Sequence, residues 1–313
     1  MSSQTRRQAT NALTFLGPAC LFLFCLLLVP IAVDIVIAFT DMEQTLRVSE
    51  FTTAQFRKIA RPDEDALLGY DFSRSFYRSL TITGTYIFLT LAIFNLTFGL
   101  VLALTTTALP DRLGAFFRAV WLLPRMAPSV VYGLLWIWAV DPTERGLLNQ
   151  ILASVGLGPV NMRLDHPMMT IVLANGFIGA SLGMLVLTSA IRSIPEHLFH
   201  AARADGAGPM AITRHVVLPA LAWPLSYITV LQTLALLVGF EYIWLIMGPS
   251  RSTTTLSMLA YTKTLAPGIG AGQYAYGAAI TLVLIVIGIV AALALWRLTN
   301  MKRLLMPPKI EVQ

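Results

Sequence analysis

Long apolar runs alternate with shorter polar stretches along the whole chain. Six of the runs are long enough to cross a bilayer as a helix, which takes about 20 mostly apolar residues. They cover approximately residues 13–39, 80–106, 119–140, 168–190, 216–247 and 274–296. The pattern therefore predicts an all-α polytopic membrane protein with six transmembrane helices in a single domain, residues 1–313.

Prolines are expected to make two of these runs irregular. The third run contains Pro124 and Pro128, and the fifth contains Pro219 and Pro224 near its start. Proline lacks the backbone N–H that a helix interior needs and clashes with the preceding turn. Such irregularities are tolerated in membranes where neighbouring helices satisfy the freed carbonyls. We therefore expect a kink or a break in both spans.

Composition narrows the class of function. The chain is 56% hydrophobic and only 12% charged, about half the charged fraction of a typical soluble domain. Its net charge of +6 comes from residues scattered between the spans, and without a basic stripe it predicts no nucleic-acid partner. The sequence also lacks a phosphate-cradling G-x-x-x-x-G-K-[ST] loop, and no metal-ligating cluster or nucleophile–base set lies in its spans. We expect no catalytic site, no metal site and no cofactor in this chain.

The connection over residues 191–215 is unusually polar for its position between two spans. Ser193 and Glu196 fit a capping box with Pro195 in the first turn, which predicts a short helix running to about Ala204. Gly206 suits the left-handed position that ends a helix. From this pattern alone, the short helix either lies on lipid headgroups or docks a soluble partner.

Several motifs resemble those of the permeases of binding-protein-dependent ABC importers. The segment His200-Ala-Ala-Arg-Ala-Asp-Gly-Ala207, followed by Leu218-Pro219, resembles the EAA loop of that family. Further similar stretches are Phe117 to Pro124, Trp136 to Pro142, Gly146 to Asn149, Phe240-Glu241, Gly248-Pro249 and Tyr276 to Ile280. The resemblance covers about residues 15–305 and is greatest for the carbohydrate, maltose-type branch. It implies the type I ABC importer permease fold.

The resemblance also implies a role for residues 191–215. They would form a cytoplasmic coupling helix seated in a cleft of a separate ATPase, whose closure drives alternating access. The residues expected at this contact are Glu196, His200, Ala201, Ala202, Asp205 and Gly206. His200 stands where the family has Glu, so Glu196, one turn earlier, is expected to take over part of that role.

The same resemblance implies partners and a location. One chain supplies half of the pathway, so a second permease, expected to be a different one, completes it. A cytoplasmic ATPase dimer binds ATP and Mg²⁺, and an extracytoplasmic solute-binding protein delivers the substrate. Lys and Arg are divided almost evenly between the two sides, so the positive-inside rule alone decides little. The cytoplasmic coupling loop puts both termini in the cytoplasm of a bacterial-type plasma (inner) membrane.

Four polar residues within the spans are candidates for the substrate pathway, because polar groups at that depth are costly and commonly functional. They are Arg125, Asn175, Gln232 and Glu241. Each has a structural alternative. Arg125 can reach headgroups or a carbonyl freed by Pro128, Asn175 and Gln232 can join helices, and Glu241 can be a solvated interfacial carboxylate. The expected substrate is sugar-like, neutral or anionic. The alternatives are a permease for a non-sugar solute and an ion-coupled secondary carrier.

Overall fold

The computed structural model describes residues 14, 16–43, 50–60, 72–265 and 272–298. Within these ranges the chain is helical except for turns, loops and one isolated antiparallel bridge between Thr40 and Phe51. The predicted all-α class is therefore confirmed. The chain divides into two compact units, one of residues 1–76 and 259–285 and the other of residues 77–258 and 286–313.

In the first unit, the loop after the first span folds back on the end of that span. The first span is a helix over Leu16–Ala38, with a π segment η1 (Phe24–Leu28) followed by α2 (Val29–Ala38). The short helix α3 (Ala54–Ala60) follows, and Phe56 on it packs its ring 5.0 Å from that of Phe39. The Thr52 amide donates to the Phe39 carbonyl at 2.8 Å. Most of α16 (Leu256–Thr264) and the first half of α17 (Tyr274–Leu298) complete this unit.

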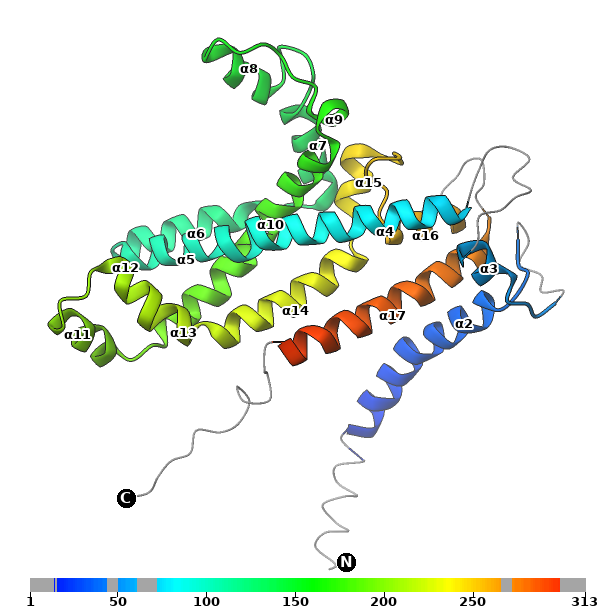
Figure 1. Cartoon of the computed structure of the whole chain (residues 1–313), viewed down its shortest axis with the longest axis horizontal. Helices are drawn as coiled ribbons and strands as arrows, with labels where there is room; N and C mark the ends of the chain where they lie inside the picture. The colour runs from blue at the N-terminus through cyan, green and yellow to red at the C-terminus, as the bar shows by residue number, and fades with distance from the viewer. Residues whose placement is uncertain (1–13, 15, 44–49, 61–71, 266–271, 299–313) are drawn as a thin grey trace, which may run out of the picture. The chain divides into compact units, whose positions relative to one another are not determined.

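The second unit contains the remaining helices (Figure 1). Its first helix combines α4 (Phe72–Leu89) from Tyr77 onwards, the π segment η2 (Thr90–Phe98) and α5 (Gly99–Ala108). It is followed by α6 (Asp111–Met126), α7 (Ser129–Ala139), α8 (Leu147–Ser154), α9 (Met162–Asp165) and α10 (Pro167–Arg192). The last part holds α11 (Glu196–Ala204), α12 (Pro209–Ile212), η3 (Thr213–Val217), α13 (Leu218–Ala220), α14 (Ala222–Val238) and α15 (Glu241–Met247).

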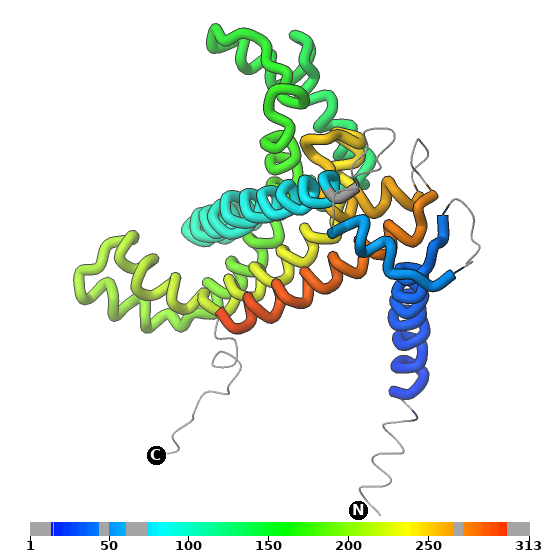
Figure 2. The backbone as a smooth tube through the Cα atoms, turned by 45° about the vertical axis from the view of Figure 1, so that its right-hand side comes forward, coloured from blue at the N-terminus to red at the C-terminus, as the bar shows by residue number. Residues whose placement is uncertain are grey.

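Helix α10 is the centre of the second unit. It packs against α5, η2, α6, α14 and α15, and its course among them can be followed in Figures 1 and 2. Small residues along α10 let these neighbours approach closely, as is usual between membrane helices. Two apolar clusters are built on it, one near Ile171 and Val172 and one near Leu187 and Ile191. The polar groups between these clusters are therefore held in rigid surroundings.

Four helices are long and apolar enough to cross a membrane, and two bent pairs raise the number to as many as six in the described part of the chain. The four are Leu16–Ala38, Arg74–Ala108, Pro167–Arg192 and Tyr274–Leu298. The bent pairs are Asp111–Met126 with Ser129–Ala139, at 99°, and Pro209–Ala220 with Ala222–Val238, at 64°. The six elements fall on the six apolar runs of the sequence, and the two bent pairs are the two runs in which proline was expected to cause a kink or a break.

The breaks do not all coincide with the prolines themselves. Ala127, which precedes Pro128, has an extended backbone with ψ 141°, because a residue before proline is pushed out of the helical region. Pro124 lies inside α6, which begins at Asp111, earlier than the predicted start at 119. In the other pair the bend is at Leu221. A further break at Gly239, with ψ 117°, divides the predicted span 216–247 into α14 and α15.

Candidate functional site

The π segment η2 presents one polar side chain to the central helix. A π-helix bonds five residues back, and the Thr97 hydroxyl follows that spacing by donating to the Ala92 carbonyl at 2.7 Å. Such segments occur frequently at functional sites. Asn95 lies within η2 and is fully buried. The π geometry thus coincides with a buried carboxamide in a membrane-spanning helix.

Close packing against α10 holds Asn95 in place. A Cβ atom at Gly179 would lie 1.9 Å from the Asn95 Oδ1 atom, and one at Gly176 would lie 2.3 Å from the Cγ atom of Phe94. Neither contact is compatible with a side chain larger than hydrogen. These two glycines therefore permit the approach of η2 to α10.

A cavity of about 350 Å³ opens beside this contact, within the second unit. Its size is at the lower end of the range for small-molecule sites, roughly 300–1,000 Å³. All four residues predicted for the pathway line it, from α6, α10, α14 and α15; they are Arg125, Asn175, Gln232 and Glu241. Three further polar side chains line it that the sequence did not single out: Tyr86, Asn95 and Tyr242.

The positive charge of Arg125 is weakly compensated by its neighbours. Its Nη1 donates to the Ile178 carbonyl on α10 at 3.5 Å, a long contact for a hydrogen bond. Among the described residues, no carboxylate forms an ion pair with it. The guanidinium is in the last turn of α6, immediately before the bend at Ala127. A cation is thus available at the cavity wall.

Glu241 also lines this cavity, and it lies close to the helix break at Gly239. It is the first residue of α15, directly after the interruption at Gly239. Its Oε1 accepts a hydrogen bond from the hydroxyl of Ser129, the first residue of α7. The hydrogen bond between Ser129 and Glu241 therefore joins the helix that follows the break at Ala127 to the helix that follows the break at Gly239.

The two amide residues behave differently. Gln232 is buried, and its Nε2 donates to the Gly179 carbonyl at 3.2 Å, which joins α14 to α10. This is the helix-to-helix bond that was the structural alternative for Gln232. Asn175 is half-buried and also lines the cavity. Gln232 thus combines a structural bond with a place at the cavity wall.

Two of the residues that sequence reasoning missed are unsatisfied. The Tyr86 hydroxyl and both amide atoms of Asn95 are buried without a hydrogen-bond partner among the described residues. An unsatisfied buried polar group costs about 1–3 kcal/mol. Asn95 is a polar residue in mid-span, as Asn175 is, so the sequence does carry a signal for it. Tyr86 carried no such signal, because a tyrosine in an apolar run is typical of a core position.

The charged connection forms the short helix α11, as predicted from its sequence. Gly206 follows its C-terminus with φ +76°. The Ala207 amide donates to the Ala202 carbonyl at 2.9 Å, and the Gly206 amide donates to Arg203 at 3.0 Å. These two bonds make a Schellman motif. The left-handed glycine predicted here is therefore confirmed. Pro209 begins the next helix, α12.

The predicted capping box is wrong. The residue before the first helical residue, Glu196, is Pro195, and no side chain caps the helix. The Ser193 hydroxyl instead donates back to the Ala190 carbonyl at 2.7 Å. Helix α10 continues to Arg192, so Ser193 is its C-terminal cap. The N-cap of α11 is Pro195, two residues later.

The predicted contact residues lie together on the outside of this loop. Glu196, His200 and Ala201 on α11, and Asp205 and Gly206 just after it, are exposed. Ala202 is half-buried on the same helix. The loop therefore presents both acidic and basic groups to its surroundings.

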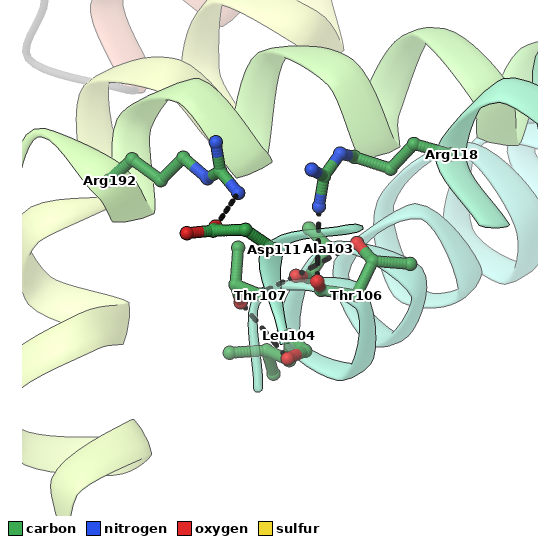
Figure 3. Close-up of polar contacts among 7 residues, drawn as sticks. All are labelled: Ala103, Leu104, Thr106, Thr107, Asp111, Arg118 and Arg192. Atoms are coloured by element: carbon green, nitrogen blue, oxygen red, sulfur yellow. Dashed lines mark hydrogen bonds and ion pairs between the residues drawn. The ribbon is translucent and has the colours of Figure 1, made fainter. Parts of the chain in front are cut away.

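The base of the loop is tied to the turn between α5 and α6 (Figure 3). Arg192 pairs with Asp111 at 3.0 Å, and Arg118 Nη1 donates to the Thr106 carbonyl near the end of α5 at 3.0 Å. The Asp111 side chain is 93% exposed, so this pair contributes little stability. Arg118 satisfies a carbonyl that the end of α5 leaves without a helical partner.

In the described part of the chain, no group of three or more His, Cys, Asp or Glu side chains is arranged to hold a metal ion. Apolar helices around a polar cavity, with a short charged helix outside them, are the arrangement expected of a membrane transport subunit. Residues 95–298 match the family described as the binding-protein-dependent transport system inner membrane component. The chain belongs to this family. It is a permease subunit of an ABC transporter, and not the subunit that hydrolyses ATP.

Individual relatives agree with this assignment. A probable ABC transporter permease protein of Pyrococcus horikoshii is 32% identical over 206 residues, covering 64% of this chain and 68% of the relative. The trehalose/maltose transport system permease protein MalF of Thermococcus litoralis is 29% identical over 223 residues, covering 69% and 72%.

A solved structure is similar over almost the whole chain. It is the crystal structure of a bacterial ABC transporter involved in the import of the acidic polysaccharide alginate. The TM-score is 0.79 at 20% identity, over 95% of this chain and 98% of that chain. At this identity the likeness shows the fold alone, which is the type I importer permease fold predicted from the sequence.

Proposed function

We propose that the chain forms half of the translocation pathway of an ATP-driven importer for a sugar or sugar derivative. The observation that carries this proposal is the cavity, where polar residues from four different helices meet. Polar groups in apolar spans are costly and commonly mark a substrate path. The residues proposed to contact the solute are Arg125, Asn175, Gln232 and Glu241.

The relatives support a sugar rather than another solute. The Thermococcus litoralis relative is named for trehalose and maltose transport, and the similar solved structure belongs to an importer of a polysaccharide. The cavity wall offers amides and hydroxyls of the kind that bind sugar hydroxyls. A permease for a non-sugar solute remains the second candidate that a ligand panel tests.

The proposed ATPase partner is inferred from helix α11 and the residues that follow it. We propose that Glu196, His200, Ala201, Ala202, Asp205 and Gly206 contact a cytoplasmic ATPase dimer, which binds the ATP and Mg²⁺. The exposure of this loop and its charges of both signs support a protein partner. A second, different permease would complete the pathway, and a solute-binding protein would deliver the sugar. Both termini would then lie in the cytoplasm of a bacterial-type plasma membrane.

Co-purification tests the ATPase contact. Deleting residues 196–205 is expected to abolish association with the ATPase. The finer test is Asp205→Lys, expected to weaken the association at least tenfold, with Glu144→Lys as the matched control. Both acids are exposed, but Glu144 lies outside the coupling loop. Equal retention of the ATPase by both variants would contradict the proposed docking surface.

Uptake into proteoliposomes tests the pathway. Arg125→Gln is expected to reduce ATP-dependent sugar uptake at least tenfold while the ATPase remains bound. Arg112→Gln, an exposed arginine on the same helix that does not line the cavity, is the control. Uptake driven by an ion gradient in the absence of ATP would instead show a secondary carrier and reject the proposed function.

A further inference from the structure

Two buried side chains that line the cavity carry polar atoms with no hydrogen-bond partner in the part of the chain that the structure describes. Tyr86 and Asn95 are both 0% exposed. The Tyr86 hydroxyl oxygen and both carboxamide atoms of Asn95 have no hydrogen-bond partner among the described residues. Buried polar groups are nearly always hydrogen-bonded, so each exception needs an explanation.

Both side chains are held in position by their surroundings. Tyr86 belongs to an apolar cluster with Ile171, Ile243 and Met258. Asn95 is confined by the close packing of η2 on α10, where Gly179 leaves room for its amide. Both residues line the cavity. The partner that we assign to their unpartnered groups is therefore the solute that occupies it.

The chemistry of the wall indicates what that occupant is. A carboxamide offers two donors and an acceptor, and a phenol both donates and accepts. A hydroxyl also donates and accepts, so a solute rich in hydroxyls can satisfy both groups. The formal charges of Arg125 and Glu241 at this cavity are opposite, so its walls carry no net charge that favours an anion.

We propose that Tyr86 and Asn95 form a hydrogen-bonding subsite that selects an uncharged, hydroxyl-rich sugar unit. The inference rests on the proposed function, and it names the substrate class of that site as neutral rather than acidic. Arg125 then acts as a donor to hydroxyl oxygens, not as the counter-ion of a carboxylate.

Uptake by the reconstituted complex with its solute-binding protein tests this subsite. The neutral probes are xylose, glucose, maltose and trehalose, and glucuronate is the anionic counterpart of glucose. The wild-type complex is expected to import at least one neutral probe and to import glucuronate at least tenfold more slowly than that probe. For that probe, Tyr86→Phe and Asn95→Leu are each expected to reduce uptake about three- to tenfold, as for one lost hydrogen bond.

If these groups only stabilised the fold, their removal would lower the melting temperature. Removing an unpartnered buried polar atom is neutral or stabilising for the fold, so both variants are expected to melt at or above the wild-type temperature. Thr90→Val is the matched control, since the Thr90 hydroxyl is also buried and unpartnered on η2 but does not line the cavity. Its uptake is expected to equal that of the wild type.

The possible failures are distinguishable. If the wild type imports glucuronate in preference to every neutral probe, the neutral subsite is wrong while the importer stands. Wild-type uptake by both Tyr86→Phe and Asn95→Leu, or an equal loss in Thr90→Val, also overturns the subsite. If the wild type imports none of the five probes, the proposed sugar importer itself fails.

Discussion

Replacing Gly206 by alanine isolates the cost of one backbone conformation at the end of α11. Gly206 has φ +76°, and a Cβ atom built there meets no atom within 4 Å. The change therefore adds no steric clash with a neighbour. What remains is the left-handed conformation itself, which costs a residue with a Cβ about 1–2 kcal/mol. The two bonds of the Schellman motif depend on that conformation.

Gly208→Ala is the matched control, two residues away. Gly208 has an ordinary φ of −74°, and a Cβ there also meets open space. Alanine at such a position restricts the unfolded chain, which favours the folded state by about 0.4–1 kcal/mol, and this gain is offset by the poorer N-cap that alanine makes for α12. The two substitutions have the same chemistry and the same exposure, but only Gly206→Ala is expected to destabilise the end of α11.

Hydrogen–deuterium exchange of peptides covering residues 196–207 measures the difference. Gly206→Ala is expected to speed exchange at the end of α11 by about 5- to 30-fold, the factor for one to two kcal/mol. Gly208→Ala is expected to leave it unchanged or slower. If both variants exchange at the same rate, the left-handed glycine does not stabilise the helix end, and the argument from φ is refuted.

Three further predictions concern other parts of the chain. The Asn149 amide donates to the carbonyls of Asp141 and two other loop residues and accepts from the Val160 amide at 2.9 Å. Asn149→Asp is therefore expected to destabilise the folded protein by about 2–4 kcal/mol, measured in thermal melts. The control Gln150→Glu is expected to change the melting temperature little. Hydrogen bonds from the side chain and amide of Thr143 lower the Asp141 pKa. The stabilising contribution of this carboxylate is therefore expected to be fully present above about pH 4, the unfolded pKa, and to be lost as pH falls through the lower folded pKa. Asp141→Asn, measured by the same melts, should remove that pH dependence, and its persistence would contradict the assignment. Gly179→Ala is expected to abolish uptake because the new Cβ would lie 1.9 Å from a buried amide oxygen; wild-type uptake would refute the close packing.

The helices of this protein could be predicted largely from local pattern. The apolar runs, the short helix α11 and its left-handed Gly206 each depend on residues close together in the chain. Local rules failed at Ser193, which fits a helix cap in sequence but ends α10 in the structure. The failure arises because two helices compete for one hydroxyl, and the length of the earlier helix decides the outcome.

The sequence by itself determined the class of protein, the approximate spans and four polar residues that are candidates for the substrate pathway. Only the tertiary structure brought Arg125 and Glu241 to one cavity, through the break at Ala127 and the break at Gly239. It also decided that Gln232 bonds to α10 and that Tyr86 and Asn95 remain unsatisfied. Hydrophobic periodicity records whether a position is apolar, but the partner of a buried polar group depends on contacts between residues distant in the chain. Those contacts exist only after the helices have packed.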